Sequence, residues 1–156
     1  MTRIFILNPN SSASVTDAMA HSIDLVKDGL WAEPVFGTLK GAPAGIESQA
    51  DIDAVIPPLL DRIAAEKADA YVIGCFSDPG LAAAKAASTA PVVGIAEAAY
   101  GEAVQLGVPF GVVSIVKASI GRHAKAIDAL GYTPFLAGDR SLDIGVTEMD
   151  LTRQIN

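Results

Sequence analysis

The segment with the clearest chemical potential is Cys-Phe-Ser-Asp-Pro-Gly at 75–80, which contains the only cysteine of the protein. The short apolar run before it, at 70–74, is typical of a buried strand. Pro79 suits the first position of a following helix, with Asp78 as its N-terminal cap. The Cys75 thiol would then lie near a helix N-terminus, whose dipole favours a thiolate and whose N–H groups could hold a carboxylate or imide oxygen. The alternative interpretation is a buried structural thiol.

Two further polar segments follow predicted strands. Asn-Pro-Asn-Ser-Ser at 8–12 comes after the first strand, and Ser114 to Lys117 comes after a later one. Ligands of open parallel sheets bind outside the carboxyl ends of the strands, so these segments and residues 75–80 could share one rim. The segment 8–12 also fits a plain turn in which a serine caps a helix, and it lacks the lysine of a phosphate-binding loop. Ser114 either finishes a strand or faces the same cleft.

The two histidines, His21 and His123, each fall on a predicted helix, where we expect them to be solvated or partly buried. No His-x-x-x-His or Cys-x-x-Cys spacing occurs, so we expect no metal site. Residue types alone leave a serine–histidine–aspartate triad open, but no Gly-x-Ser-x-Gly elbow supports one.

Apolar runs rich in β-branched residues alternate with alanine-rich stretches of helical spacing. The runs predict strands at 3–7, 35–39, 70–74, 91–94, 110–115 and 133–136, and the stretches predict helices at 14–26, 51–67, 79–87, 95–106 and 119–130. Such alternation indicates an α/β fold in which helices flank a parallel sheet. We expect a first βα domain over residues 1–96, which carries Cys75, and the start of a second, similar βα domain over 97–156.

Composition narrows the classes of protein. The chain has 156 residues, a net charge of −7 and a hydrophobic content of 51%, which argues against disorder. Its 11 basic residues are scattered rather than clustered, so we expect no nucleic-acid partner. The longest apolar run is too short to span a membrane, no signal peptide is evident, and a single cysteine forms no internal disulfide. We therefore expect a cytoplasmic protein without a membrane partner.

Three motifs occur in order along the chain: Ile-Leu-Asn-Pro-Asn-Ser at 6–11, Tyr-Val-Ile-Gly-Cys-Phe-Ser-Asp-Pro-Gly at 71–80, and Pro-Val-Val-Gly-Ile-Ala-Glu-Ala-Ala at 91–99. With them the chain resembles the hydantoin racemase (allantoin racemase-like) branch of the aspartate/glutamate racemase superfamily, from about residue 3 to at least residue 130. The resemblance implies two flavodoxin-like βα domains that face each other across a cleft. It also implies racemase chemistry without pyridoxal phosphate or metal.

The resemblance further implies roles for particular residues. In that family two cysteines, one per domain, flank the stereocentre of the substrate: one thiolate removes the α-proton and the other thiol protonates the opposite face. Cys75 matches the first of these cysteines. The implied substrate contacts are Asn10, Ile46, Phe76, Ser77 and Ser114. Ile46 is preceded by Gly45 where the family often carries a serine.

This chemistry is physically reasonable for a small carbon acid. Inversion needs a base and an acid on opposite faces, each with a pKa near the working pH, and donors that stabilise the enolate oxygen. A 5-substituted hydantoin suits these demands because its ring carbonyl spreads the negative charge. We therefore expect a small-molecule substrate of this type.

The second cysteine of the family has no counterpart in the 156 residues, so we expect a truncated second domain. Two alternatives stay open: a non-catalytic ligand-binding or interaction domain of the same fold, and an isomerase or decarboxylase of the same superfamily. Truncation would leave apolar surface uncovered, which favours self-association. We therefore expect a homo-oligomer.

Overall fold

The main sheet of the protein is parallel and follows the flavodoxin-like order. A computed structural model describes residues 1–146 and 148. Within them, a four-stranded sheet runs in the order β2-β1-β3-β4. Its strands are β1 (Thr2–Asn8), β2 (Ala32–Thr38), β3 (Ala70–Ile73) and β4 (Val92–Gly94). The chain moves outward from β1 in both directions, so the order reverses between β1 and β3, the place where such sheets bind ligands.

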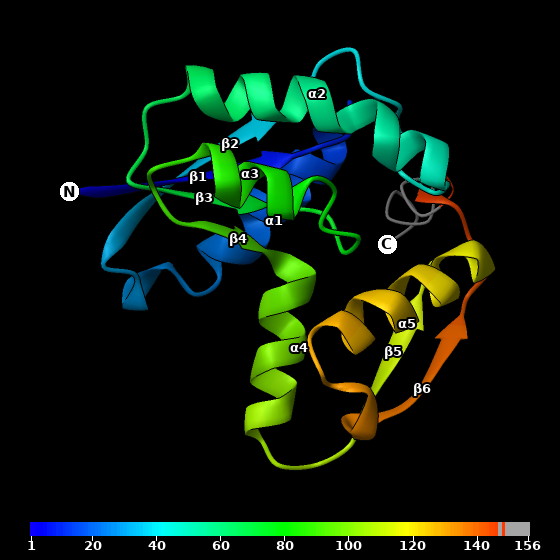
Figure 1. Ribbon diagram of the computed structural model, residues 1–156. Helices are drawn as coiled ribbons and strands as arrows, with labels where there is room; N and C mark the ends of the chain where they lie inside the picture. Colours follow the sequence, from blue (N-terminus) through cyan, green and yellow to red (C-terminus); the bar gives the residue numbers. More distant parts are fainter. Residues whose placement is uncertain (147, 149–156) are drawn as a thin grey trace.

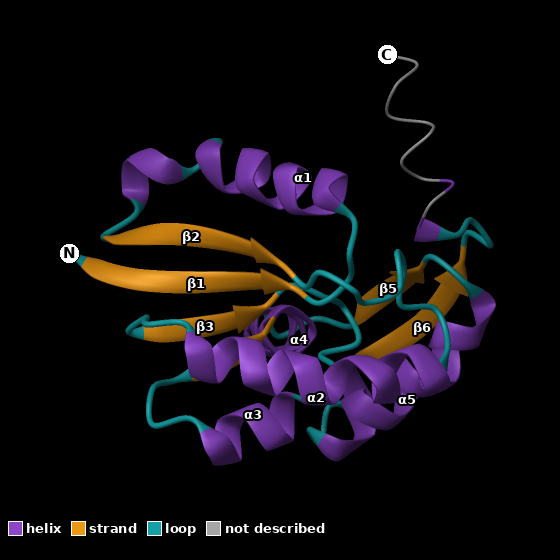
Figure 2. Ribbon diagram, turned by 90° about the horizontal axis from the view of Figure 1, so that it is seen from above, coloured by secondary structure: helices purple, strands orange, loops and turns teal. Residues whose placement is uncertain are grey.

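Helices cover both faces of this sheet, as Figure 2 shows. One face packs against α2 (Gln49–Ala65) and α3 (Leu81–Ala87), and the opposite face carries α1 (Ala13–Asp24). Ser12 caps α1, and Ser48 and Asp51 form a capping box at the start of α2, which satisfies N–H groups that a helix leaves free. The parallel α/β fold expected from the sequence is confirmed.

The hydrophobic core lies between the sheet and α2. Phe5 and Leu7 of β1 point to this side and are each 1% exposed. Leu59 of α2 and Ile73 of β3 are fully buried in the same cluster. Burial of side chains of this size contributes roughly 1.5–3 kcal/mol each to folding, so this layer holds β1 and β3 firmly in register.

The α1 face of the sheet is less completely covered. Ile6, Phe36 and Val72 point to this side and remain partly exposed. Together with Val15 and Met19 of α1 they line an open groove of about 510 Å³. The apolar strands of this sheet are therefore well buried on only one face.

A second, smaller sheet follows α4 (Ile95–Gln105), which leads away from the main sheet (Figure 1). It pairs β5 (Phe110–Ser114) in parallel with β6 (Leu136–Ser141), and α5 (Ile120–Ala129) connects them. Its core consists of Ala96, Tyr100, Val112 and Ile127. The predicted domain boundary between residues 96 and 97 falls inside α4 and stays a prediction.

The strand predicted at 133–136 is wrong. Thr133–Phe135 forms a 3-10 turn, and the strand begins only at Leu136 and continues to Ser141. Pro134 fits the first turn of a short helix because its φ is fixed and it has no N–H to offer a strand. The residues of β6 are mostly polar or small and at least partly exposed. They therefore lack the alternation of apolar and polar residues that indicates a strand.

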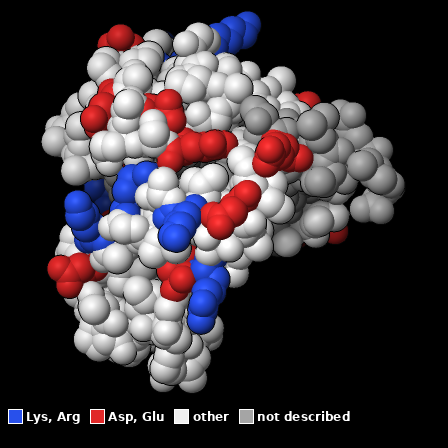
Figure 3. Space-filling model, turned by 90° about the vertical axis from the view of Figure 1, so that its right-hand side faces the viewer, with Lys and Arg blue, Asp and Glu red and all other residues white. Residues whose placement is uncertain are grey.

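The surface carries charges of both signs. Figure 3 shows Lys and Arg side chains interspersed with Asp and Glu on one face, without a continuous basic stripe there. Among the described residues, no helix combines the length and the apolar character that crossing a membrane requires.

Candidate functional site

A small cavity lies where the carboxyl ends of β1 and β3 meet the second sheet. Its volume is about 200 Å³. Every site residue that the sequence suggested lies on its wall: Asn10, Ile46, Cys75, Phe76, Ser77 and Ser114. The wall also includes His123 of α5 and Val146. The structure thus brings together residues from six separate segments, while their roles stay predictions.

The loop after β1 is held by its own side chains. Asn8 is fully buried, and its Nδ2 donates to Asn10 Oδ1 at 2.7 Å and to the carbonyl of Ser12 at 2.9 Å. Asn8 is therefore part of the scaffold rather than a group that could bind a ligand. Asn10 Oδ1 also accepts from the Ser12 N–H at 2.9 Å. The Nδ2 of Asn10 has no partner among the described residues, and it is the donor that this loop offers to the cavity.

Cys75 follows β3 directly and lies partly buried at the cavity wall as a free thiol. Burial raises the pKa of the Cys75 thiol, and the nearby carboxylate of Asp78 adds to this. Hydrogen bonds from the backbone and side chain of Ser77 and the positive charge of Arg122 act in the opposite direction. The net effect is a raised pKa, which disfavours the thiolate. We had expected a helix N-terminus to favour it.

The helix also begins later than predicted. Gly80, with φ 69°, is the N-cap of α3, and the first helical residue is Leu81. Asp78 does not cap this helix. Its carboxylate instead accepts hydrogen bonds from the N–H groups of Ala96, at 3.1 Å, and Glu97, at 2.7 Å, at the start of α4. The loop that carries Cys75 is thereby tied to the helix that leads to the second sheet.

Phe76, on the cavity wall, packs against aromatic side chains of two helices. Its ring meets Tyr100 of α4 edge to face, with centroids 5.4 Å apart, and His123 in the same way at 5.6 Å. Such aromatic pairs contribute about 0.5–1.5 kcal/mol beyond the area they bury. The position of Phe76 therefore depends on both α4 and α5.

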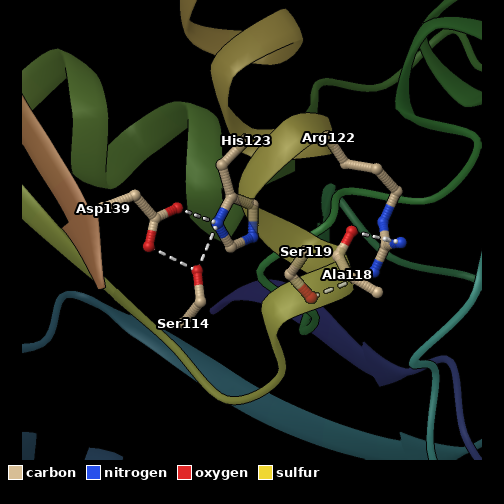
Figure 4. Close-up of polar contacts among 6 residues, drawn as sticks. All are labelled: Ser114, Ala118, Ser119, Arg122, His123 and Asp139. Atoms are coloured by element: carbon tan, nitrogen blue, oxygen red, sulfur yellow. Dashed lines mark hydrogen bonds and ion pairs between the residues drawn. The ribbon is translucent and has the colours of Figure 1, made fainter. Parts of the chain in front are cut away.

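Ser114, His123 and Asp139 form a closed polar cluster beside the cavity (Figure 4). The Ser114 hydroxyl donates to Asp139 Oδ1 at 2.6 Å, and His123 Nδ1 lies 3.0 Å from Asp139 Oδ2 and 3.0 Å from Ser114 Oγ. The side chains of His123 and Asp139 are 7% and 5% exposed. A nucleophilic triad places the serine on Nε2 and the aspartate on Nδ1. Here both partners occupy Nδ1, so the cluster lacks the geometry of such a triad.

His123 and Asp139 are residues that sequence reasoning missed. We expected His123 to be solvated or partly buried, and this is wrong, whereas His21 is exposed as expected. A signal was present, because His123 lies four residues before the buried Ile127, on the same face of α5. No comparable signal marks Asp139, which lies in the part of the sequence where the strand pattern is weak.

Two hydrogen bonds join distant segments next to Ile46 and Val146 of the cavity wall. The carboxylate of Glu47 accepts from the Val146 N–H at 2.7 Å, and Arg122 Nη2 donates to the Glu47 carbonyl at 2.9 Å. A Cβ at Gly45 would lie 2.9 Å from the Cβ of Val146. The absence of a side chain at Gly45 therefore allows residues 45–47 and residue 146 to approach closely.

The described part of the chain contains no group of three or more His, Cys, Asp or Glu side chains arranged to hold a metal ion. The fold and the cavity define an α/β protein with a small site at the switch point of a parallel sheet. Its wall carries apolar side chains, a few polar ones and a thiol.

Comparisons with known proteins place it more closely. The model of the Asp/Glu/Hydantoin racemase family matches residues 4–155, so the chain belongs to this family. It is 33% identical over 150 residues to a hydantoin racemase of Rhizobium meliloti and 34% identical over 148 residues to one of Paenarthrobacter aurescens, covering 94% and 92% of this chain. The chain spans 62% of the length of each of these relatives.

Its structure is similar to that of allantoin racemase from Klebsiella pneumoniae. The TM-score is 0.90 at 26% identity, and the match covers 99% of this chain and 65% of the other. The resemblance noted from the three sequence motifs is therefore confirmed.

Proposed function

We propose that this protein is a cofactor-independent racemase of 5-substituted hydantoins or related small carbon acids, and that Cys75 transfers the proton. The observation that carries the proposal is that the Cys75 thiol and the free amide of Asn10 line one cavity at the switch point of the sheet. Membership of the Asp/Glu/Hydantoin racemase family supports it.

The proposed reaction uses each group for what its chemistry allows. The Cys75 thiolate removes the proton from the substrate's stereocentre, and the electron pair of the C–H bond moves toward the neighbouring carbonyl oxygen. Asn10 Nδ2 donates a hydrogen bond to that oxygen as its charge develops. Because burial raises the pKa of Cys75, the thiolate is the stronger base once it forms.

Phe76, Ile46 and Ser114 complete the proposed site in different ways. Phe76 and Ile46 supply apolar wall that excludes water from the reacting carbon. Ser114 contributes mainly through Asp139, to which its hydroxyl is bound. Ser77 hydrogen-bonds to the thiol, so its effect on substrate passes through Cys75.

The test is hydrogen exchange at C5 of an enantiopure 5-substituted hydantoin in D₂O, together with loss of optical rotation. We expect the unchanged chain to catalyse both and Cys75→Ala and Cys75→Ser to lose at least about 100-fold of the rate, the usual scale of acid–base catalysis. Circular dichroism of the variants provides the folding control. Undiminished exchange and racemisation in both variants would show that Cys75 is not the base.

Self-association and a cytoplasmic location are further parts of the proposal. The free Cys75 thiol suits a reducing compartment. Large apolar side chains around the end of α1 are exposed, among them Leu25 at 74% and Trp31 at 75%. Exposed apolar surface favours contacts between protein molecules when it forms a continuous patch. Light scattering over a concentration series measures the mass directly, and a monomer at every concentration would contradict self-association.

A further inference from the structure

The guanidinium group of Arg122 joins the start of α5 to the segment that precedes α2. Its Nη2 donates to the backbone carbonyl of Glu47 at 2.9 Å and to Ser119 Oγ at 3.0 Å. Its Nη1 donates to the carbonyl of Ala118 at 3.0 Å. In Figure 4 this group extends toward Ala118 and Ser119, away from the polar cluster around His123. One side chain therefore connects segments that are 75 residues apart in the sequence.

The segments that Arg122 connects both contribute to the cavity wall. Ile46, the neighbour of Glu47, is 5% exposed and lines the cavity, and Ser119 lines it as well. The carboxylate of Glu47 accepts a hydrogen bond from the N–H of Val146, a third residue of the wall, at 2.7 Å. Arg122 thus lies behind the wall, where its contacts fasten the parts of the wall to one another.

These contacts suit arginine better than lysine. A guanidinium presents several donors in fixed directions, so it can bind oxygens of two segments at once, whereas an ammonium group is a compact point charge on a flexible stem. The Nε of Arg122 is buried and has no hydrogen-bond partner among the described residues. A buried, unpaired donor costs free energy, so the bonds of the two Nη atoms must offset this cost and hold the side chain in place.

The positive charge of Arg122 also acts on the thiol of the site. Burial raises the pKa of Cys75 and the carboxylate of Asp78 raises it further, whereas Arg122 acts in the opposite direction. The carboxylate of Asp51 also interacts with Arg122, although hydrogen bonds at the start of α2 are the main reason why the pKa of Asp51 is lowered. Removal of the Arg122 charge should therefore make the Cys75 thiolate less favourable.

From these contacts we propose that Arg122 is a positioning residue of the site, which holds the segment of Ile46 and Glu47 against α5 and so fixes the width of the cavity beside Cys75. The inference rests on the proposed racemase function. Arg122 acts through other groups: Ile46 is held where it can contact the substrate, and the charge of the guanidinium favours the ionised form of the thiol.

The first experiment measures the space around Cys75 and needs no substrate. Cys75 is the only thiol, so alkylation reports this residue alone. The ratio of the rates with bulky N-phenyl iodoacetamide and with iodoacetamide does not depend on the ionised fraction of the thiol. We expect this ratio to rise about fivefold in Arg122→Lys and Arg122→Gln, the equivalent of one hydrogen bond.

The matched control is Lys125→Gln, which removes a positive charge from an exposed position of the same helix. It should leave the ratio unchanged. The pH profile of alkylation separates the charge of Arg122 from its contacts: the profile should move to higher pH in Arg122→Gln and stay in place in Arg122→Lys, which keeps the charge. Circular dichroism shows whether each variant is folded.

The second experiment measures racemisation of a 5-substituted hydantoin. Arg122→Lys should raise KM about fivefold and change kcat less than about twofold, because the loosened wall weakens substrate binding while the thiol and the charge remain. A residue that only stabilises the fold would lower the melting temperature without this split between KM and kcat.

The two experiments separate the two proposals. If the unchanged chain racemises no hydantoin but the alkylation ratio rises in both Arg122 variants and not in Lys125→Gln, the proposed function fails and the positioning role of Arg122 stands. If folded Arg122→Lys and Arg122→Gln both keep the alkylation ratio of the unchanged chain, the inference is overturned, whatever the turnover.

Discussion

The carboxylate of Asp78 accepts a hydrogen bond from the backbone N–H of Glu97 at 2.7 Å, nineteen residues further along the chain. A second bond, from the Ala96 N–H, completes the cap of α4. Asp78 has φ 42°, in the left-handed region that costs a non-glycine residue about 1–2 kcal/mol. The cap and the strained backbone belong to the same residue, three positions after Cys75.

Substitution of Asp78 should separate these two effects. Asp78→Ala removes the cap and should lower the free energy of unfolding by about 1–2 kcal/mol. Asp78→Gly also removes the cap but relieves the backbone strain, so it should be less destabilising than Asp78→Ala. Urea denaturation measures both, with Asp61→Ala on the exposed surface of α2 as the control. Equal stability of Asp78→Ala and the unchanged chain would show that the cap contributes nothing.

Gly94 leaves room for the same contact. A Cβ at this position would overlap the carboxyl group of Asp78, so Gly94→Ala should displace the Asp78 side chain and destabilise the protein. The matched control is Gly101→Ala within α4, where a Cβ has nothing within 4 Å. That change should stabilise the protein by about 0.5–1 kcal/mol, because alanine favours helix over glycine. Thermal unfolding should therefore move in opposite directions for the two variants.

Tyr100 should make stability depend on high pH. Burial raises the pKa of its phenol to about 12, and the carboxylates of Asp78 and Asp139 act in the same direction. The unfolded chain loses this proton near pH 10 and the folded chain only near pH 12. Between these values the unfolded state binds fewer protons, so the free energy of unfolding falls as the pH rises.

Tyr100→Phe should remove this part of the fall. It also removes a buried hydroxyl that has no hydrogen-bond partner among the described residues, so stability at neutral pH should be unchanged or higher by roughly 1 kcal/mol. A loss of more than that amount at neutral pH would show that the hydroxyl is bound in solution.

The reactivity of Cys75 should reflect its burial. Because burial raises the pKa of this thiol, alkylation should need a higher pH than alkylation of a small free thiol does. Ser77→Ala removes a hydrogen bond that favours the thiolate, so it should move the alkylation profile to still higher pH. A profile at or below that of the free thiol would contradict the buried environment.

Asp139→Asn should test how the ring of His123 is held. Its carboxylate requires a hydrogen on Nδ1, whereas an amide can donate to the ring and leave the hydrogen on Nε2. We expect ¹⁵N spectra of the histidine side chains to show the tautomer of His123 reversed while His21 is unchanged. An unchanged tautomer would mean that Asp139 does not set the ring orientation.

Most of the helices and strands could be predicted from local sequence. Apolar runs such as 70–74 and the serine cap at Ser12 correspond to observed elements because each depends on neighbours along the chain. The rim position of Cys75 and Asn10 followed from the geometry of parallel sheets. The contact of Asp78 with α4 could not be predicted in this way. Local sequence favours a cap on the next helix, α3, and the contact with α4 forms only in the folded chain.

The parts of the site that escaped prediction depend on contacts between distant segments. Asp139 contacts His123 only because β6 pairs with β5. The sequence of β6 has little apolar alternation from which this strand could be predicted. Glu47 meets Val146 across 99 residues of sequence. No local pattern encodes such a pairing, which requires the docking of both sheets.

That last contact couples the site to the folding of the chain as a whole. The cavity wall is complete only after both sheets have formed and packed together, because it is built from Asn10, Ile46, Cys75, His123 and Val146. A ligand of the cavity binds the folded form and not the unfolded one, so at 100 times its dissociation constant it adds about 2.7 kcal/mol to the free energy of unfolding. The melting temperature measured against ligand concentration is therefore an assay for ligands of this protein that requires no knowledge of the reaction.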